Sequence, residues 1–106
     1  MSISTHVLDA VSGKPAAGVP VALLDAGHVT LASAHTDDDG RVAALGDELS
    51  PGVYRLQFDT AAYFTGRGIG AFYPEVTIAF EITDAAGKYH VPLLLSPYAY
   101  STYRGS

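Results

Sequence analysis

The length, charge and cysteine content of this chain exclude several classes of protein. At 106 residues it has room for one domain, covering residues 1–106, which can bury roughly two-thirds of the surface that its unfolded form exposes. A net charge of −5 argues against a nucleic-acid-binding module, and the absence of cysteine excludes disulfide bonds and cysteine-held metals. No window is apolar enough to span a membrane. We therefore assign the high apolar content, 48%, to a subunit interface.

Strand signals recur along the chain at spacings of roughly 8–12 residues. The expected strands cover residues 5–11, 19–25, 30–36, 41–45, 53–59, 76–83, 89–95 and 98–103. Residues 60–66 form the one expected helix, with Thr60 as its N-terminal cap and Gly66 at its end. Seven or eight short strands separated by Gly, Pro, Asp and Ser turns predict an all-β antiparallel sandwich or barrel.

Alternation of side chains predicts the buried faces of the later strands. In residues 53–59 and 76–83 the large apolar residues fall on every second position, which is typical of one buried face. In residues 89–95 one face carries Tyr89, Val91, Leu93 and Leu95, whereas His90, Pro92 and Leu94 share the other. A second face that is both apolar and histidine-bearing indicates an interface or a cleft.

Two glycine-containing motifs lack the context that a ligand site needs. The GRGIG run at residues 66–70 neither follows a strand nor begins a helix, so we interpret it as a flexible loop rather than a phosphate-binding loop. In the DDDG run at residues 37–40, a calcium-loop reading would place ligand positions on His35 and Gly46, which carry no carboxylate. We expect a hairpin turn there, and the spacing of the four histidines predicts no metal site.

A few polar residues in apolar surroundings form the candidate catalytic group: His6, Arg41, His90, Arg104 and Ser106. Taken singly, each is more often structural or solvated, and His28 and His35 are interpreted as turn and edge residues. Together they supply a histidine that can activate water and an arginine that can stabilise an oxyanion. This set suits metal-free hydrolysis of an activated amide or imide. Sequence spacing alone does not show that the residues meet.

Five segments resemble the transthyretin-related family, specifically its 5-hydroxyisourate hydrolase branch. They are THVLD at residues 5–9, GKPA at 13–16, DGR at 39–41, YPEV at 73–76 and YHVPLLLSPYAYSTYRGS at 89–106. The resemblance spans essentially the whole chain. The closing Tyr-Arg-Gly-Ser is specific to the enzyme branch, since transthyretin, the hormone carrier with the same fold, lacks it.

The resemblance implies a transthyretin-like, eight-stranded, two-sheet antiparallel β-sandwich with one short helix, assembled as a homotetramer that is a dimer of dimers. It implies hydrolysis of 5-hydroxyisourate to OHCU (2-oxo-4-hydroxy-4-carboxy-5-ureidoimidazoline) in urate degradation, without a cofactor or metal. Carried over by position, His6, Arg41 and His90 would be catalytic. Tyr103, Arg104, Gly105 and Ser106 would line the substrate site. Either histidine could be the general base. Arg41 would also favour the neutral form of a nearby histidine.

The main alternative function is that of a binding protein: a transthyretin-like channel that carries a small aromatic ligand without catalysis. A carrier would require an apolar channel centre, whereas His6, Arg41, His90 and Arg104 would make it polar and basic. A structural sandwich domain of a larger assembly is a third possibility, disfavoured because no linker-like segment is found. The N-terminal sequence lacks the features of a signal peptide, so the expected location is the cytoplasm.

Overall fold

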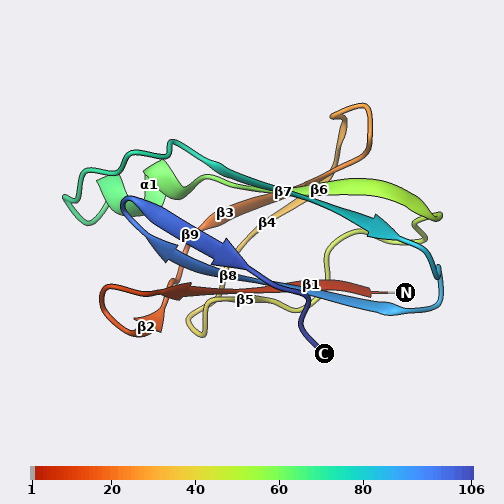
Figure 1. The fold of residues 1–106 in the computed structure, drawn as a ribbon, viewed down its shortest axis with the longest axis horizontal. Helices are drawn as coiled ribbons and strands as arrows, with labels where there is room; N and C mark the ends of the chain where they lie inside the picture. Colours follow the sequence, from red (N-terminus) through yellow and green to blue (C-terminus); the bar gives the residue numbers. More distant parts are fainter. Residues whose placement is uncertain (1) are drawn as a thin grey trace.

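The structure is a computed structural model that describes residues 2–106, and it consists of two β-sheets packed face to face with one helix at one end (Figure 1). The first sheet contains β1 (Ser2–Asp9), β2 (Lys14–Pro15), β5 (Arg41–Val42), β8 (Lys88–Ser96) and β9 (Ala99–Thr102). The second contains β3 (Pro20–Leu24), β4 (Thr30–His35), β6 (Gly52–Phe58) and β7 (Val76–Ile82). The predicted all-β sandwich with one short helix is confirmed.

The first sheet has the order β2-β1-β8-β9, with β5 also paired to β1, and the second has the order β4-β3-β6-β7. Strands β1 and β8 pair in parallel from Ser2 opposite Lys88 to Asp9 opposite Leu95. The other described pairs are antiparallel. The prediction of an antiparallel sandwich is therefore wrong at this one pair. An alternating apolar pattern reads the same in both directions, so it carries no information about strand direction.

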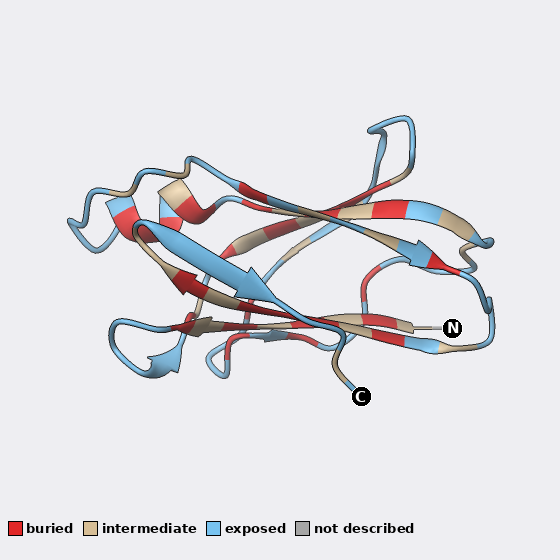
Figure 2. Cartoon of the chain, in the orientation of Figure 1, coloured by how far each residue is buried: buried red, intermediate tan, exposed pale blue. Residues whose placement is uncertain are grey.

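The core lies between the two sheets and is built from the alternating inward positions of their strands (Figure 2). Its fully buried side chains include Ile3 and Val7 of β1, Leu23 of β3, Leu56 and Phe58 of β6, and Leu93 of β8. The faces predicted for β6, β7 and β8 are confirmed, because the intervening residues of β6 and β8 are mostly half-buried or exposed. His90 and Leu94 therefore lie on the outer face of the first sheet.

Four local expectations differ from the structure. The strand expected at residues 5–11 covers Ser2–Asp9, and the one expected at 41–45 covers only Arg41–Val42. Lys14–Pro15 forms an additional short strand in a segment whose residues are typical of turns. The DDDG segment is not a hairpin, because β4 and β5 belong to different sheets and the turn crosses between them.

The helix α1 (Thr60–Thr65) is capped by Asp59 and not by Thr60. The Asp59 carboxylate accepts from the Ala62 N–H at 3.1 Å. Thr60 is buried and donates its hydroxyl to the Tyr73 carbonyl, so it is unavailable as a cap. Gly66 ends the helix as predicted. No helix within residues 2–106 has the length and apolar character needed to cross a membrane.

Candidate active site

The pairing of three strands brings polar side chains together on the outer face of the first sheet. His6 of β1 lies opposite Arg41 of β5, and Ser4 of β1 lies opposite His90 of β8. Paired residues project to the same side of a pleated sheet, and so do alternate residues of one strand. His6, Arg41 and His90, which are far apart in the sequence, thus share one surface. Ser4 joins them.

The turn before β5 fixes the position of Arg41. The Asp37 carboxylate accepts from the backbone N–H groups of Asp39 and Arg41, each at 2.9 Å. Gly40 has a φ of 75°, and its carbonyl accepts from the Val7 N–H at 2.7 Å. A Cβ at Gly40 would collide with the Val7 carbonyl oxygen. Glycine is therefore required here, because only it lets the chain approach β1 closely enough to place Arg41 beside His6.

His90 is held by contacts on both edges of its ring. The Ser4 Oγ lies 2.8 Å from the His90 Nδ1, and the Gly105 N–H donates to the His90 carbonyl at 2.8 Å. On the Cδ2 edge the ring packs so closely on Gly105 that a Cβ there would lie 3.1 Å from Cγ and nearer still to Cδ2. Gly105 thus permits the C-terminal segment to cover one side of the imidazole.

An open cavity of about 320 Å³ lies over Ser4, Arg41 and His90, and His6 is not among its lining residues. Its polar lining comes from Arg41 and His90, from Lys88 one step along the same face of β8, from Ser2 and Ser4 of β1, and from Ser106. Pockets that bind small molecules begin at roughly this size. The two cations and the histidine give the cavity the character of a site for a polar, electron-rich ligand.

The electrostatic surroundings favour the neutral form of His90. Partial burial lowers the pKa of its imidazole, and the electrostatic influence of the neighbouring Arg41 and His6 lowers it further. A hydrogen bond from the ring to the Ser4 backbone raises the pKa but does not restore the ordinary value of 6.5. Arg41 thus lowers the pKa of His90, in the direction that the family resemblance implies for a neighbouring histidine. His6 is half-buried, and its Nε2 is a buried polar atom without a hydrogen-bond partner among residues 2–106.

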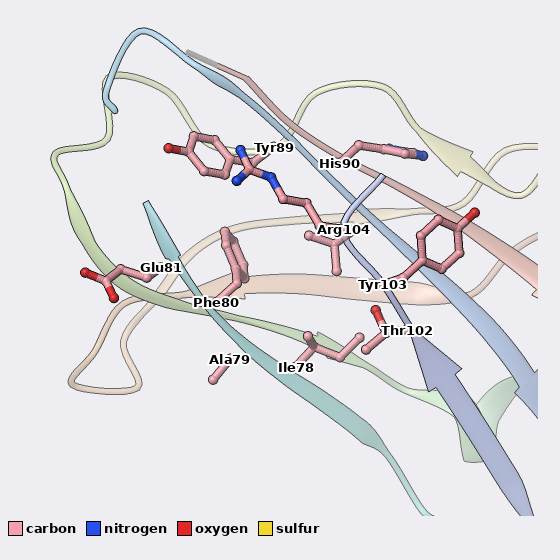
Figure 3. A pocket seen from close by; sticks show the side chains of 10 residues that line it. Ile78, Ala79, Phe80, Glu81, Tyr89, His90, Thr102, Tyr103 and Arg104 are labelled. Atoms are coloured by element: carbon pink, nitrogen blue, oxygen red, sulfur yellow. The ribbon is translucent and has the colours of Figure 1, made fainter. Parts of the chain in front are cut away.

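Tyr103 and Arg104 line a different cavity, of about 300 Å³, between the edge strands β7 and β9 and beside Tyr89 (Figure 3). The Arg104 guanidinium lies over the Tyr89 ring, 5.0 Å from its centroid. Figure 3 shows the His90 imidazole directed away from this cation, although His90 contributes to both cavities. The structure therefore brings Gly105 to His90, and Ser106 to the cavity that Arg41 and His90 line. It places Tyr103 and Arg104 at the neighbouring groove.

The remaining histidines stand apart from both cavities. His28 lies in a turn with a φ of 66°, and His35 is exposed at the end of the edge strand β4, as predicted. Within residues 2–106, no cluster of three or more His, Cys, Asp or Glu side chains is arranged to hold a metal ion. Sequence reasoning missed Ser4, because the first strand was expected to begin at Thr5. The alternation of Ser2, Ser4 and His6 was the available signal.

Comparisons with known proteins agree with this architecture. The model of the HIUase/Transthyretin family matches residues 3–105. A 5-hydroxyisourate hydrolase of Salmonella dublin is 49% identical over 109 residues, covering 98% of this chain and 80% of that protein.

Solved structures give the same result. A Klebsiella pneumoniae 5-hydroxyisourate hydrolase has a TM-score of 0.91 at 39% identity, over 99% of this chain and 93% of that one. Sea bream transthyretin in complex with thyroxine has a TM-score of 0.90 at 33% identity, over 99% and 95% of the two chains. With the family model matched along nearly its full length, and with close relatives in sequence and structure, this chain belongs to the HIUase/Transthyretin family.

Proposed function

We propose that this protein hydrolyses 5-hydroxyisourate to OHCU, and that the cavity over Arg41 and His90 is its active site. The observation that carries the proposal is the convergence of His6, Arg41 and His90 on one surface. Relatives such as the Salmonella dublin protein, named 5-hydroxyisourate hydrolases, support the choice of substrate. The chain also ends in the Tyr-Arg-Gly-Ser sequence that is typical of the enzyme branch.

His90 is the general base in this proposal. A base must be neutral before it accepts a proton, and burial, Arg41 and His6 all lower the pKa of His90 in the direction that keeps it neutral. Its Nδ1 is occupied by Ser4, which leaves Nε2 for a water molecule. His6 has a buried, unpartnered Nε2, an arrangement that costs free energy unless a bound molecule satisfies it. We propose that His6, which pairs with Arg41 beside the cavity and is not among its lining residues, orients the substrate ring.

The reaction needs only water and these side chains. The Nε2 of His90 takes one proton of the water as its oxygen bonds to a ring carbonyl carbon, and the carbonyl oxygen becomes negatively charged. The Arg41 guanidinium stabilises this oxyanion. The carbon–nitrogen bond of the ring then breaks, and the departing nitrogen takes the proton from His90. The product is a new carboxylic acid, which releases the remaining water proton to solvent to become a carboxylate, and the enzyme returns to its starting state.

The C-terminal segment completes the proposed site in two ways. Ser106 lines the cavity, and its hydroxyl is available to hydrogen-bond the ring of the substrate. Tyr103 and Arg104 face the neighbouring groove, with Arg104 stacked on Tyr89. We propose that these two residues contribute to the substrate site from the side of that groove.

We also propose that the protein is a homotetramer, a dimer of dimers, in which the outer face of the first sheet lines a channel. That face carries the half-buried Leu8 and Leu94 alongside the polar residues. Burial of this apolar surface would stabilise the assembly and exclude water from the site. Sedimentation or light scattering at assay concentrations should give four protomer masses. A fully active monomer would contradict this part of the proposal.

The carrier function is the second candidate, favoured by the structural similarity to transthyretin in complex with thyroxine. The two functions differ in what the centre of the channel must contain. The iodinated aromatic rings of such a hormone would have to desolvate the polar groups at the channel centre, and buried charges without partners are costly. Thyroxine binding measured by calorimetry, together with absence of turnover, would favour the carrier.

Activity is tested with 5-hydroxyisourate generated freshly from urate by urate oxidase, with its decay followed by absorbance. His90→Asn should reduce kcat/KM by roughly 10²–10⁴-fold, the range for loss of a general base. His35→Asn is the matched control, because this histidine is exposed on the other sheet and should leave turnover unchanged. Unchanged turnover in His90→Asn would refute the assignment of the base.

A further inference from the structure

We propose that Ser4 is a positioning residue that fixes the orientation and tautomer of the His90 imidazole. The inference rests on the proposed function, since it gives Ser4 a role in preparing the base. It starts from the 2.8 Å contact between Ser4 Oγ and His90 Nδ1, which joins residues 86 positions apart in the chain.

Buried neighbours and strand pairing hold the backbone on both sides of Ser4. On either side of it, Ile3 is fully buried and Thr5 is 1% exposed in the core. The Thr5 hydroxyl donates to the Val91 carbonyl at 2.7 Å, which ties the same stretch of β1 to the residue after His90. Ser4 and His90 are also directly paired in the parallel ladder. The hydroxyl and the imidazole are therefore held in register by contacts that do not depend on either of them.

The contact defines which ring nitrogen faces the cavity. Ser4 occupies the Nδ1 edge of the imidazole, while Gly105 packs on the opposite, Cδ2 edge. With both edges covered, the Cε1–Nε2 side is left for substrate and water. We assign the Nδ1–H as donor and the Ser4 Oγ as acceptor, because a neutral ring protonated at Nδ1 carries its lone pair at Nε2.

Loss of the hydroxyl should impair chemistry more than binding. Without it the neutral ring can adopt either tautomer and can rotate about its side-chain bonds, so only part of the population presents a basic Nε2. A typical net hydrogen-bond contribution corresponds to a fall in kcat of about threefold to tenfold. KM should change by less than about twofold, because the hydroxyl is directed at His90 and not at substrate.

The test compares Ser4→Ala, Ser4→Thr and the control Ser33→Ala by steady-state kinetics and by ¹⁵N NMR of the histidine rings. Ser33 is exposed on β4 in the other sheet, so it matches the chemistry of the change without touching the site. We expect Ser4→Ala to lower kcat and to convert a single Nδ1–H tautomer of His90 into a mixture. Ser4→Thr, which keeps the hydroxyl on a strand-compatible side chain, should restore both readouts.

The outcomes separate this inference from the proposed function. If wild type and Ser33→Ala both fail to turn over substrate, the proposed function is wrong, and the NMR comparison of wild type with Ser4→Ala still decides the positioning role. If wild type is active but Ser4→Ala keeps its kcat and its ring spectrum, the inference is overturned. It is also overturned if Ser4→Thr is as impaired as Ser4→Ala, since the hydroxyl would then not be the group that matters.

Discussion

Replacement of Gly105 by alanine should damage the site while leaving the fold largely intact. The added Cβ would lie 3.1 Å from the His90 Cγ and 3.2 Å from its Cβ, and still closer to Cδ2. Carbon atoms pack best at about 3.5–4.0 Å, so something must move. The φ of Gly105 is not in the left-handed region, and the effect is therefore steric and not one of backbone strain.

The structure offers two ways to relieve the collision. The imidazole can turn away from Gly105, which displaces it from Ser4, or the C-terminal segment can retreat, which breaks the 2.8 Å hydrogen bond from the Gly105 N–H to the His90 carbonyl. The second route removes one hydrogen bond at the edge of the protein, about 0.5–1.5 kcal/mol of unfolding free energy. Either route moves catalytic atoms by an amount of the order of 1 Å, and a displacement of that size can cost about 10²-fold in rate.

Gly105→Ala is therefore expected to lower kcat/KM by roughly tenfold to a hundredfold while unfolding free energy falls by less than about 1.5 kcal/mol. Activity is measured by the decay of 5-hydroxyisourate and stability by urea denaturation. Gly70→Ala is the matched control, because a Cβ there would meet nothing within 4 Å and its φ is unremarkable. Retention of wild-type kcat/KM in Gly105→Ala would refute the argument that this glycine sets the position of His90.

Three further predictions concern titration and the buried network beside helix α1. In wild type, kcat/KM should rise with pH through a midpoint below the ordinary histidine pKa of 6.5. Arg41→Gln should have a lower rate, and its midpoint should lie at higher pH than that of wild type, because Arg41 lowers the pKa of His90. Asp9→Asn should cost about 1–3 kcal/mol, because the carboxylate is 4% exposed and accepts from two backbone N–H groups and the Tyr63 hydroxyl. Burial raises the pKa of Asp9, but these hydrogen bonds outweigh burial, so the net shift of the pKa is downward. The ionised carboxylate therefore contributes to the unfolding free energy above the unfolded pKa of about 3.9, and this contribution is lost as pH falls through the lower folded pKa. The difference between wild type and Asp9→Asn in urea denaturation should therefore shrink below pH 4, and a constant difference would contradict this account. Tyr63→Phe should destabilise the protein less than Asp9→Asn at pH 7, because it removes one hydrogen bond to the Asp9 carboxylate and leaves the two backbone donors in place. Equal urea denaturation midpoints for Tyr63→Phe and wild type would contradict this prediction.

The faces of strands were predictable because the signal is local. Alternation in β6 and β8 separates buried from outward residues, and it placed His90 on the outer face without knowledge of any other strand. The helix was recognisable from its short segment and its terminal glycine, although the capping residue was off by one. In each case the deciding interactions lie within a few residues along the chain.

The meeting of the site residues was not predictable from the sequence in the same way. Ser4 and His90 are neighbours only because β1 and β8 pair in parallel, and Arg41 reaches β1 only because a turn crosses between sheets at Gly40. Residue patterns singled out His6, Arg41 and His90 as candidates, and resemblance to a known family implied that they act together, but their spacing along the chain did not show that they meet. Arg104 follows the last strand, where the alternation of side chains no longer predicts which way a residue points. Its stacking on Tyr89 was therefore not predicted.

The parallel pairing of β1 with β8 also bears on how the protein folds. Contacts between distant parts of a chain form slowly, because closing a long loop lowers the entropy of the chain before the contact stabilises it. Ser4 and His90 are 86 residues apart, whereas the β6–β7 and β8–β9 pairs join neighbouring segments. On a ribosome, β1 leaves the tunnel long before β8, and the edge of β1 that pairs with β8 stays unpaired until β8 arrives. We expect the site to be assembled in one of the last steps of folding, so that catalytic competence reports completion of the whole sandwich.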